Sequence, residues 1–172
     1  MQTPLFSRGL TFATWRVILR HMAAKSYSLP KPMSGGNRYA AELLGLSKTD
    51  PVSLAAAVRA GLDYSTFTWF SRETKLSGPE VCRVIKVKER TLDRRKTEGR
   101  LQPEESDRLL RISRVFALAI DLFEGDRNAA KQWLETPQRA LAGSTPLTFA
   151  ESDVGAREVE SLIGRLEHGV GV

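Results

Sequence analysis

The sequence predicts an all-α protein, in which a helix-turn-helix domain is followed by a second, smaller helical domain. Three observations lead to this fold class. Apolar residues recur at helical spacing along most of the chain, and no segment shows the strict alternation of a half-buried strand. Residues 81–99 have helix-turn-helix spacing, with Cys82 at the crossing, Lys86 at the turn and Leu92 as the inward anchor. The 172 residues, 41% of them apolar, can bury the core of one domain or of two small ones.

The sequence predicts that residues 1–37 form a basic arm, which is poorly ordered or partly helical. The arm contains no acidic residue, since the first is Glu42, and its cations are Arg8, Arg16, Arg20, Lys25 and Lys31. Residues 10–24 could form an amphipathic helix, but two arginines interrupt the apolar run that a signal peptide requires. Met22 and Met33 could each begin a shorter product, so the sequence does not choose between them and Met1.

Residues 38–105 predict the helix-turn-helix domain, a module typical of DNA-binding proteins. Its early helices are expected at 38–46, 54–60 and 65–75. Gly45 would close the first, Ser53 would cap the second after a turn, and Gly61 would end it. The third helix carries Phe67, Trp69 and Phe70. Aromatic residues at helical spacing are more typical of a core than of a base-stacking platform, so we expect them to be buried.

The helix pair itself begins at Ser77, which can cap its first helix with Glu80 as the reciprocal partner. The turn is expected at 86–88 and the second helix at 89–98. Because Leu92 must face the core, we expect residues 89–91, residue 94 and Arg95 to face solvent or DNA. Between residues 83 and 100 there are eight basic and three acidic side chains, a local charge of +5 in a chain whose net charge is +6. This cluster favours an anionic partner.

We therefore predict seven DNA-binding residues in and after the turn: Lys86, Lys88, Glu89, Arg90, Thr91, Arg94 and Arg95. Arg90 and Arg94 share a helix face and could reach guanine edges or phosphates, whereas Glu89 could accept from a cytosine amine. The two lysines are expected at phosphates, which position a protein on DNA without specifying a sequence. The alternative is a basic helix that is merely solvated.

Residues 106–172 predict a helical domain for binding another protein and for dimerisation. The helix that starts near Gln102 is apolar almost all the way round, so it should bridge two parts of the core or lie in a dimer interface. Further helices are expected from Asp126 to residue 136, from 146 to 151 and from 156 to 168. The last helix has an apolar stripe of Val159, Leu162, Ile163 and Leu166. A flexible tail, residues 169–172, follows it.

The chain lacks the residue patterns of an enzyme. Cys82 is the only cysteine, which excludes a disulfide framework and a thiolate metal cage and fits a reducing cytoplasm. His21 and His168 lie far apart without ligand spacing, and no glycine-rich loop precedes a Lys-Ser or Lys-Thr. No apolar run approaches the roughly 20 residues that span a bilayer. We therefore predict no catalytic site, no metal, no cofactor and no membrane partner.

The C-terminal half resembles a known family. The segments 89–119, 129–152 and 154–170 resemble the Xre/MbcA/ParS-type antitoxins, which pair a helix-turn-helix with a C-terminal toxin-binding domain. The resemblance covers roughly residues 53–172. Its motif residues occur in the family's order: Trp133, Leu134, Pro137, Leu141, Gly143, Thr145, Pro146, Leu147, Gly155, Ala156, Arg157, Gly164, Arg165 and Gly169. Two departures are Lys86, where the family often has a turn glycine, and Lys88, where a serine-like cap is usual.

The resemblance implies a type II toxin–antitoxin function. The partner would be a RES-domain toxin, an enzyme that consumes NAD, and the antitoxin would occlude its active site, form a homodimer and repress its own promoter by binding operator DNA. The expected toxin-binding residues are Arg165, Glu167, His168, Gly169, Val170, Gly171 and Val172. Residues 151–168 carry five acids against two arginines, which suits a positively charged dinucleotide site. The alternatives are a stand-alone dimeric helix-turn-helix repressor, or a structural interaction module with a degenerate helix pair.

Overall fold

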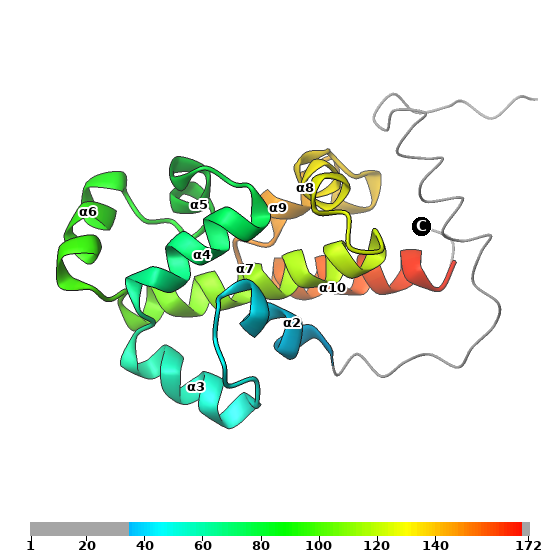
Figure 1. The fold of residues 1–172 in the computed structure, drawn as a ribbon. Helices are drawn as coiled ribbons and strands as arrows, with labels where there is room; N and C mark the ends of the chain where they lie inside the picture. The colour runs from blue at the N-terminus through cyan, green and yellow to red at the C-terminus, as the bar shows by residue number, and fades with distance from the viewer. Residues whose placement is uncertain (1–34, 170–172) are drawn as a thin grey trace, which may run out of the picture.

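The computed structural model describes residues 35–169, with side chains from Arg38 onward, and this part of the chain is helical (Figure 1). Its elements are α2 (Gly35–Leu43), α3 (Pro51–Ala60), α4 (Tyr64–Thr74), α5 (Gly78–Val84), α6 (Glu89–Glu98), α7 (Pro103–Leu122), α8 (Arg127–Glu135), the 3-10 helix η1 (Arg139–Leu141), α9 (Pro146–Phe149) and α10 (Asp153–Glu167). Within the described range there is no strand, only an isolated bridge between Asp63 and Arg100. The all-α prediction is confirmed. None of the helices in this range is long and apolar enough to cross a membrane.

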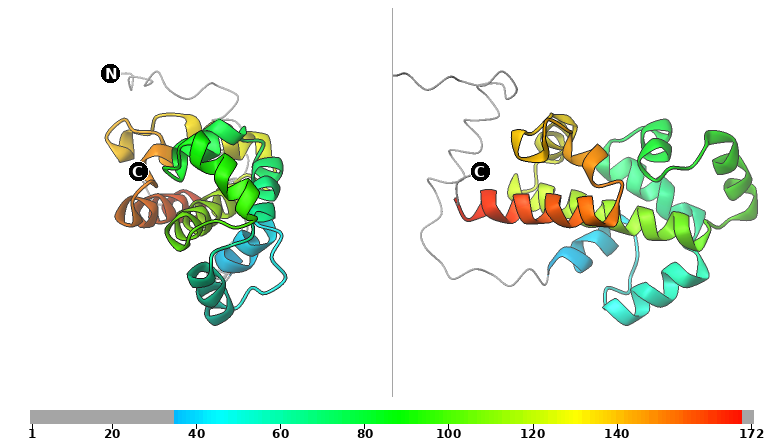
Figure 2. Two further views of the ribbon diagram at one scale, coloured as in Figure 1. Left: turned by 90° about the vertical axis from the view of Figure 1, so that its left-hand side faces the viewer. Right: turned by 180° about the vertical axis from the view of Figure 1, so that it is seen from behind.

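Helix α7 is the central element. Helices α2, α3, α4, α8 and α10 all pack against it, and α10 runs alongside it in the same direction (Figures 1 and 2). The backbone N–H of Gln102 donates to Oε2 of Glu105 over 2.8 Å, which satisfies one of the free donors at the start of the helix. Leu109, Ile112 and Phe116 are at most 1% exposed. Of the two alternatives predicted for this helix, the bridge within the core is confirmed, and a part in a dimer interface stays a prediction.

One apolar core extends through the described residues. Phe70 of α4 meets Phe116 of α7 edge to face with 5.5 Å between ring centroids, and Phe123 lies 6.3 Å from Trp133 of α8. The domain boundary predicted at residues 105/106 falls inside α7, so helical backbone crosses it. The division into two domains stays a prediction.

Several helix ends differ from those that the sequence predicts. Helix α2 begins at Gly35 and thus includes the last residues of the predicted arm; residues 1–34 lie outside the described range, as do 170–172 of the predicted tail. Asp50, and not Ser53, caps α3, because its Oδ1 accepts from the Ser53 N–H over 2.8 Å. This hydrogen bond holds the pKa of Asp50 below its usual range.

Trp69 and the start of α10 are two further corrections. Trp69 is 42% exposed instead of buried, and the guanidinium carbon of Arg72 lies 4.0 Å from the centre of its ring. Helix α10 starts at Asp153, three residues earlier than predicted, because the Ser152 hydroxyl accepts from the Gly155 N–H over 3.0 Å. The predicted buried stripe of this helix is confirmed at Val159, Leu162 and Ile163, and Leu166 is partly buried.

Candidate functional site

The helix pair α5–α6 is built as its local sequence predicts. Ser77 and Glu80 form a capping box at the start of α5: the Ser77 N–H donates to Glu80 Oε2 over 2.6 Å, and Ser77 Oγ accepts from the Glu80 N–H over 3.4 Å. Hydrogen bonds from Ser77 hold the pKa of Glu80 below its usual range. Helix α6 spans the predicted residues and ends at Gly99, whose φ of 74° is left-handed. The helix-turn-helix prediction is confirmed.

The turn between the two helices keeps its geometry although it lacks glycine. Lys86 has a φ of 55°, in the left-handed region that glycine adopts without strain. A side chain in this region costs about 1 kcal/mol. The Val87 N–H returns to the Cys82 carbonyl over 2.9 Å, and Val87 itself is buried. Lys88 stands at the N-cap of α6 and its side chain makes no capping hydrogen bond.

Helix α6 lies at one end of the molecule (Figure 1), and several of its charged side chains are exposed. Glu89, Arg90 and Arg94 are exposed and Thr91 is half-buried, while Leu92 packs against the core as predicted. The Arg94 Nε lies 3.6 Å from Glu98 Oε1, an exposed pair of little energetic weight. The structure thus brings Lys86, Lys88, Glu89, Arg90 and Arg94 to the surface around one turn and helix.

Arg95 does not belong to that outer face, and the prediction that it points toward solvent or DNA is wrong. It is 6% exposed, and its Nε and Nη2 donate to the two carboxylate oxygens of Glu105 over 2.8 and 3.0 Å. Its Nη1 donates to Glu98 over 2.7 Å. The reason is helical spacing, since Arg95 follows the inward Leu92 by three residues and therefore shares its face. Arg95 thus fixes α6 onto the start of α7.

This ion pair changes the protonation properties of both partners. The hydrogen bonds that Arg95 donates to the Glu105 carboxylate raise the pKa of Arg95 above its usual range. Burial alone would raise the pKa of the Glu105 carboxyl, but hydrogen bonds from Arg95 and from the Gln102 N–H outweigh it, so this pKa is lowered. Glu105 is a residue that local sequence reasoning missed, because it lies ten positions from its partner in a different helix.

The turn of the helix pair also contacts the junction between α9 and α10. Lys86 Nζ lies 3.2 Å from Glu151 Oε2. In the same region Arg108 of α7 donates to the Ile85 carbonyl over 3.1 Å, and Arg111 donates to the Glu151 carbonyl over 3.3 Å. Glu151 is far from the turn in sequence, and the acidic composition of the region around it is the only sequence signal that could have indicated an ion pair there.

The C-terminal end of α10 lies at the other end of the molecule from α6 (Figure 2). Arg165 is half-buried, and its guanidinium donates to Glu158 and to the Ser161 hydroxyl, each over 2.8 Å. Glu167 is half-buried, and His168 and Gly169 are exposed. Gly169 ends the helix with a φ of 67°. Val170, Gly171 and Val172 lie outside the described residues.

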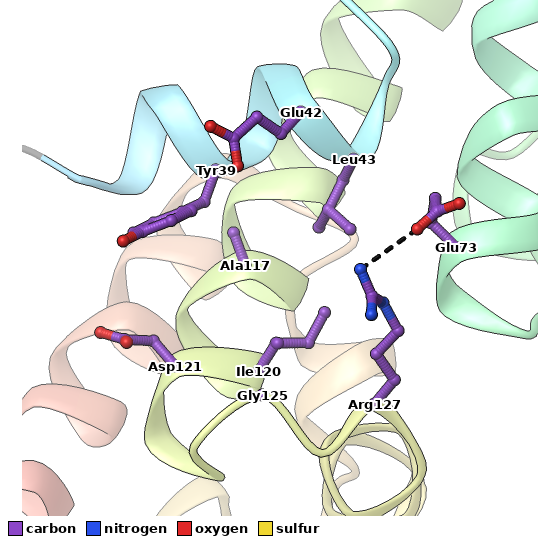
Figure 3. Close-up of a pocket in the computed structure, with 9 residues that line it drawn as sticks. All are labelled: Tyr39, Glu42, Leu43, Glu73, Ala117, Ile120, Asp121, Gly125 and Arg127. Atoms are coloured by element: carbon purple, nitrogen blue, oxygen red, sulfur yellow. Dashed lines mark hydrogen bonds and ion pairs between the residues drawn. The ribbon is translucent and has the colours of Figure 1, made fainter.

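A pocket of about 210 Å³ opens between α2, α4, α7 and the start of α8 (Figure 3). Leu43, Ala117 and Ile120 line it, and Arg127 donates to Glu73 over 3.1 Å among its lining residues. Its walls come from helices that are distant in sequence, so sequence reasoning did not predict it. Among residues 35–169, no group of three or more His, Cys, Asp or Glu side chains could hold a metal ion. Burial, then Glu89 and Asp93, raise the pKa of the Cys82 thiol.

Two parts of the chain match described protein families. Residues 53–114 match the antitoxin Xre-like helix-turn-helix domain, and residues 118–169 match the antitoxin Xre/MbcA/ParS C-terminal toxin-binding domain. The first match ends and the second begins within α7.

The chain is also similar to curated proteins called Antitoxin Xre. The one from Yersinia enterocolitica is 37% identical over 128 residues, which are 74% of this chain and 86% of that protein. The one from Photorhabdus laumondii is 31% identical over 128 residues, again 74% of this chain and 86% of that protein. A third, from Pseudomonas putida, is 33% identical over 72 residues, 42% of this chain and 45% of that protein.

Proposed function

Because the chain belongs to the Xre-like antitoxins, in which a helix-turn-helix domain precedes an Xre/MbcA/ParS toxin-binding domain, we propose that it neutralises a RES-domain toxin and represses its own promoter. The toxin would be an NAD-consuming enzyme whose active site the C-terminal end of this chain occludes. The chain would act as a homodimer, the arrangement in which helix-turn-helix proteins meet two operator half-sites.

One observation supports this division of labour. The exposed face of α6 and the C-terminal end of α10 lie at opposite ends of the molecule (Figures 1 and 2). A single chain can therefore present one surface to DNA while the other surface is covered by a protein. The match to a toxin-binding domain favours this function over a stand-alone repressor.

For the DNA surface, we propose Lys86, Lys88, Glu89, Arg90, Thr91 and Arg94. Arg90 and Arg94 are exposed and can reach a partner at the surface, whereas Arg95 is buried. Arginine pairs bidentately with guanine or phosphate, and lysine meets phosphate as a point charge. Arg95 contributes by holding α6 in place through Glu105.

For the toxin surface, we propose Arg165, Glu167, His168 and Gly169, followed by 170–172. A site that binds the phosphates of a dinucleotide is positively charged, and the acidic residues of α10 would steer the chain toward it. The Arg165 guanidinium is already paired with Glu158 within the helix, which would fix its direction at the contact.

The toxin surface is tested by removing 169–172 and co-expressing the product with the toxin encoded next to this gene. We expect growth arrest and NAD loss to return, while operator binding stays intact. Val154→Ala is the matched control, because this exposed valine lies at the opposite end of α10 and should leave neutralisation unchanged. Full protection by the truncated chain would show that the tail does not occlude the toxin.

The DNA surface is tested by fluorescence anisotropy on a duplex from the chain's own promoter. Arg90→Ala and Arg94→Ala should each weaken binding by about 1–3 kcal/mol if the guanidinium reads a base. Arg59→Ala is the control, since Arg59 is an exposed arginine on α3. Equal affinities for all three variants would contradict the assignment of α6. A mass measurement of the complex with the adjacent gene product separates the antitoxin from a stand-alone repressor.

A further inference from the structure

We propose that Glu151, which belongs to the toxin-binding part of the chain, weakens DNA binding by competing with a DNA phosphate for the Lys86 ammonium. The inference rests on the proposed function, because it requires that α6 and its preceding turn meet DNA. It adds a residue outside the helix pair to the determinants of operator affinity.

The pairing joins two parts of the chain that are distant in sequence. Lys86 lies in the turn of the helix pair, directly before α6, and Glu151 lies between α9 and α10. The distance between Lys86 Nζ and Glu151 Oε2 is 3.2 Å, and the two side chains are 54% and 27% exposed. Because the pair remains open to solvent, a phosphate can displace the carboxylate without first unfolding the junction.

Both backbones are held in place independently of this ion pair. The buried Ile85 and Val87 flank Lys86 and fix the left-handed turn, and the Ile85 carbonyl accepts from Arg108 over 3.1 Å. The Glu151 carbonyl accepts from Arg111 over 3.3 Å, and its N–H donates to the Thr148 carbonyl over 3.2 Å. Removing the Glu151 charge should therefore free the lysine without moving either segment.

A carboxylate and a phosphate oxygen make the same kind of contact with an ammonium group, and two anions beside one ammonium repel each other, so the Glu151 carboxylate opposes phosphate binding at Lys86. Exposed ion pairs of this type shift equilibria by a factor of about 1.4 to 5. A lysine released to a phosphate also displaces about one more condensed cation from the duplex. Loss of the Glu151 charge should thus tighten binding and make it more sensitive to salt.

The experiment measures operator affinity by fluorescence anisotropy between about 50 and 200 mM salt, a range in which phosphate contacts dominate the change. Glu151→Gln keeps the shape of the side chain and should bind about two- to fivefold tighter. Its plot of log affinity against log salt should be steeper by up to about 0.9. Thermal unfolding of each variant verifies that the fold is intact.

Asp153→Asn is the matched control. Asp153 is two residues further along and its carboxylate pairs with Arg111 and Arg157, so this variant removes the same charge without touching Lys86. It should leave the salt slope unchanged. Lys86→Gln is the second control, and in that background Glu151→Gln should have no effect.

Two results would overturn the inference. One is that Glu151→Gln and Asp153→Asn have equal affinities and slopes, which would mean that net charge alone matters. The other is that Glu151→Gln still tightens binding when Lys86 is already glutamine. Failure of the proposed function is distinguishable, because the unaltered chain would then not bind its promoter at all.

Discussion

Replacing Glu105 by glutamine tests the most buried ion pair among the described residues. The carboxylate accepts from the Arg95 Nε over 2.8 Å, from its Nη2 over 3.0 Å and from the Gln102 N–H over 2.8 Å. The Arg95 and Glu105 side chains are only 7% and 10% exposed. Glu105→Gln preserves the shape but leaves the buried guanidinium with Glu98 as its remaining carboxylate.

The expected loss of stability follows from this geometry. Breaking a buried ion pair by removing one partner costs about 3–5 kcal/mol. The glutamine oxygen can still accept one hydrogen bond and Glu98 stays in place, so we expect the lower end, about 3 kcal/mol. For a chain of this length, that corresponds to a decrease in Tm of roughly 6–12 °C.

The assay is urea unfolding followed by circular dichroism, with Glu104→Gln as the matched control. Glu104 is the neighbouring glutamate and is exposed, so its replacement should change stability by less than about 0.5 kcal/mol. Equal stabilities of the two variants at pH 7 would refute the importance of the pair.

The same pair predicts a pH dependence. Because the pKa of Glu105 is lower in the folded state, its contribution is fully present above the unfolded pKa of about 4.3 and is lost as the pH falls through the folded value. The difference between the unaltered chain and Glu105→Gln should therefore shrink at acid pH. A gap that stays constant down to about pH 3 would contradict the ionic origin of the stabilisation.

Two further pairs of substitutions, each a test with its control, probe the backbone. Gly155→Ala should destabilise the fold by about 1–3 kcal/mol in urea unfolding, because a Cβ there would lie 1.8 Å from the Phe149 carbonyl oxygen. Its control is Gly164→Ala, which has open space around it and should be neutral or stabilising. Ala142→Gly should increase the free energy of unfolding by about 0.5–1 kcal/mol and so raise Tm, because the φ of 53° at this position suits glycine. Its control is Ala56→Gly within α3, which should lower the free energy of unfolding by about 1 kcal/mol. A destabilising Ala142→Gly would count against strain at that turn.

Much of the fold could be predicted from local sequence. Helix spacing, the Ser77 and Glu80 capping box and the glycine after α6 are features of neighbouring residues, and the structure confirms the bounds of α6. The turn at Lys86 was also predictable, because the spacing of Cys82, Lys86 and Leu92 is that of a helix-turn-helix. Local patterns were less reliable where two caps competed, since Asp50 and Ser53 are both good N-cap residues and the structure selects Asp50.

The contacts that could not be predicted join distant segments. Helical spacing from Leu92 puts Arg95 on the inner face of α6, but the carboxylate that pairs with it there, Glu105, lies on the next helix and has no local sequence signal. Glu151 looked like an ordinary acidic surface residue until α7 and α10 placed it beside Lys86. A sequence indicates which side chains are polar, but the pairing of polar side chains depends on tertiary packing.

The single core around α7 has a consequence for how the protein unfolds and is degraded. The surfaces proposed for DNA and for toxin share that core, and both family matches meet within this helix. Opening α7 would therefore expose the supports of both surfaces together, in one cooperative event. Cleavage within α7 should therefore disable both proposed surfaces at the same time, whereas loss of residues 169–172 alone should affect only the proposed toxin surface.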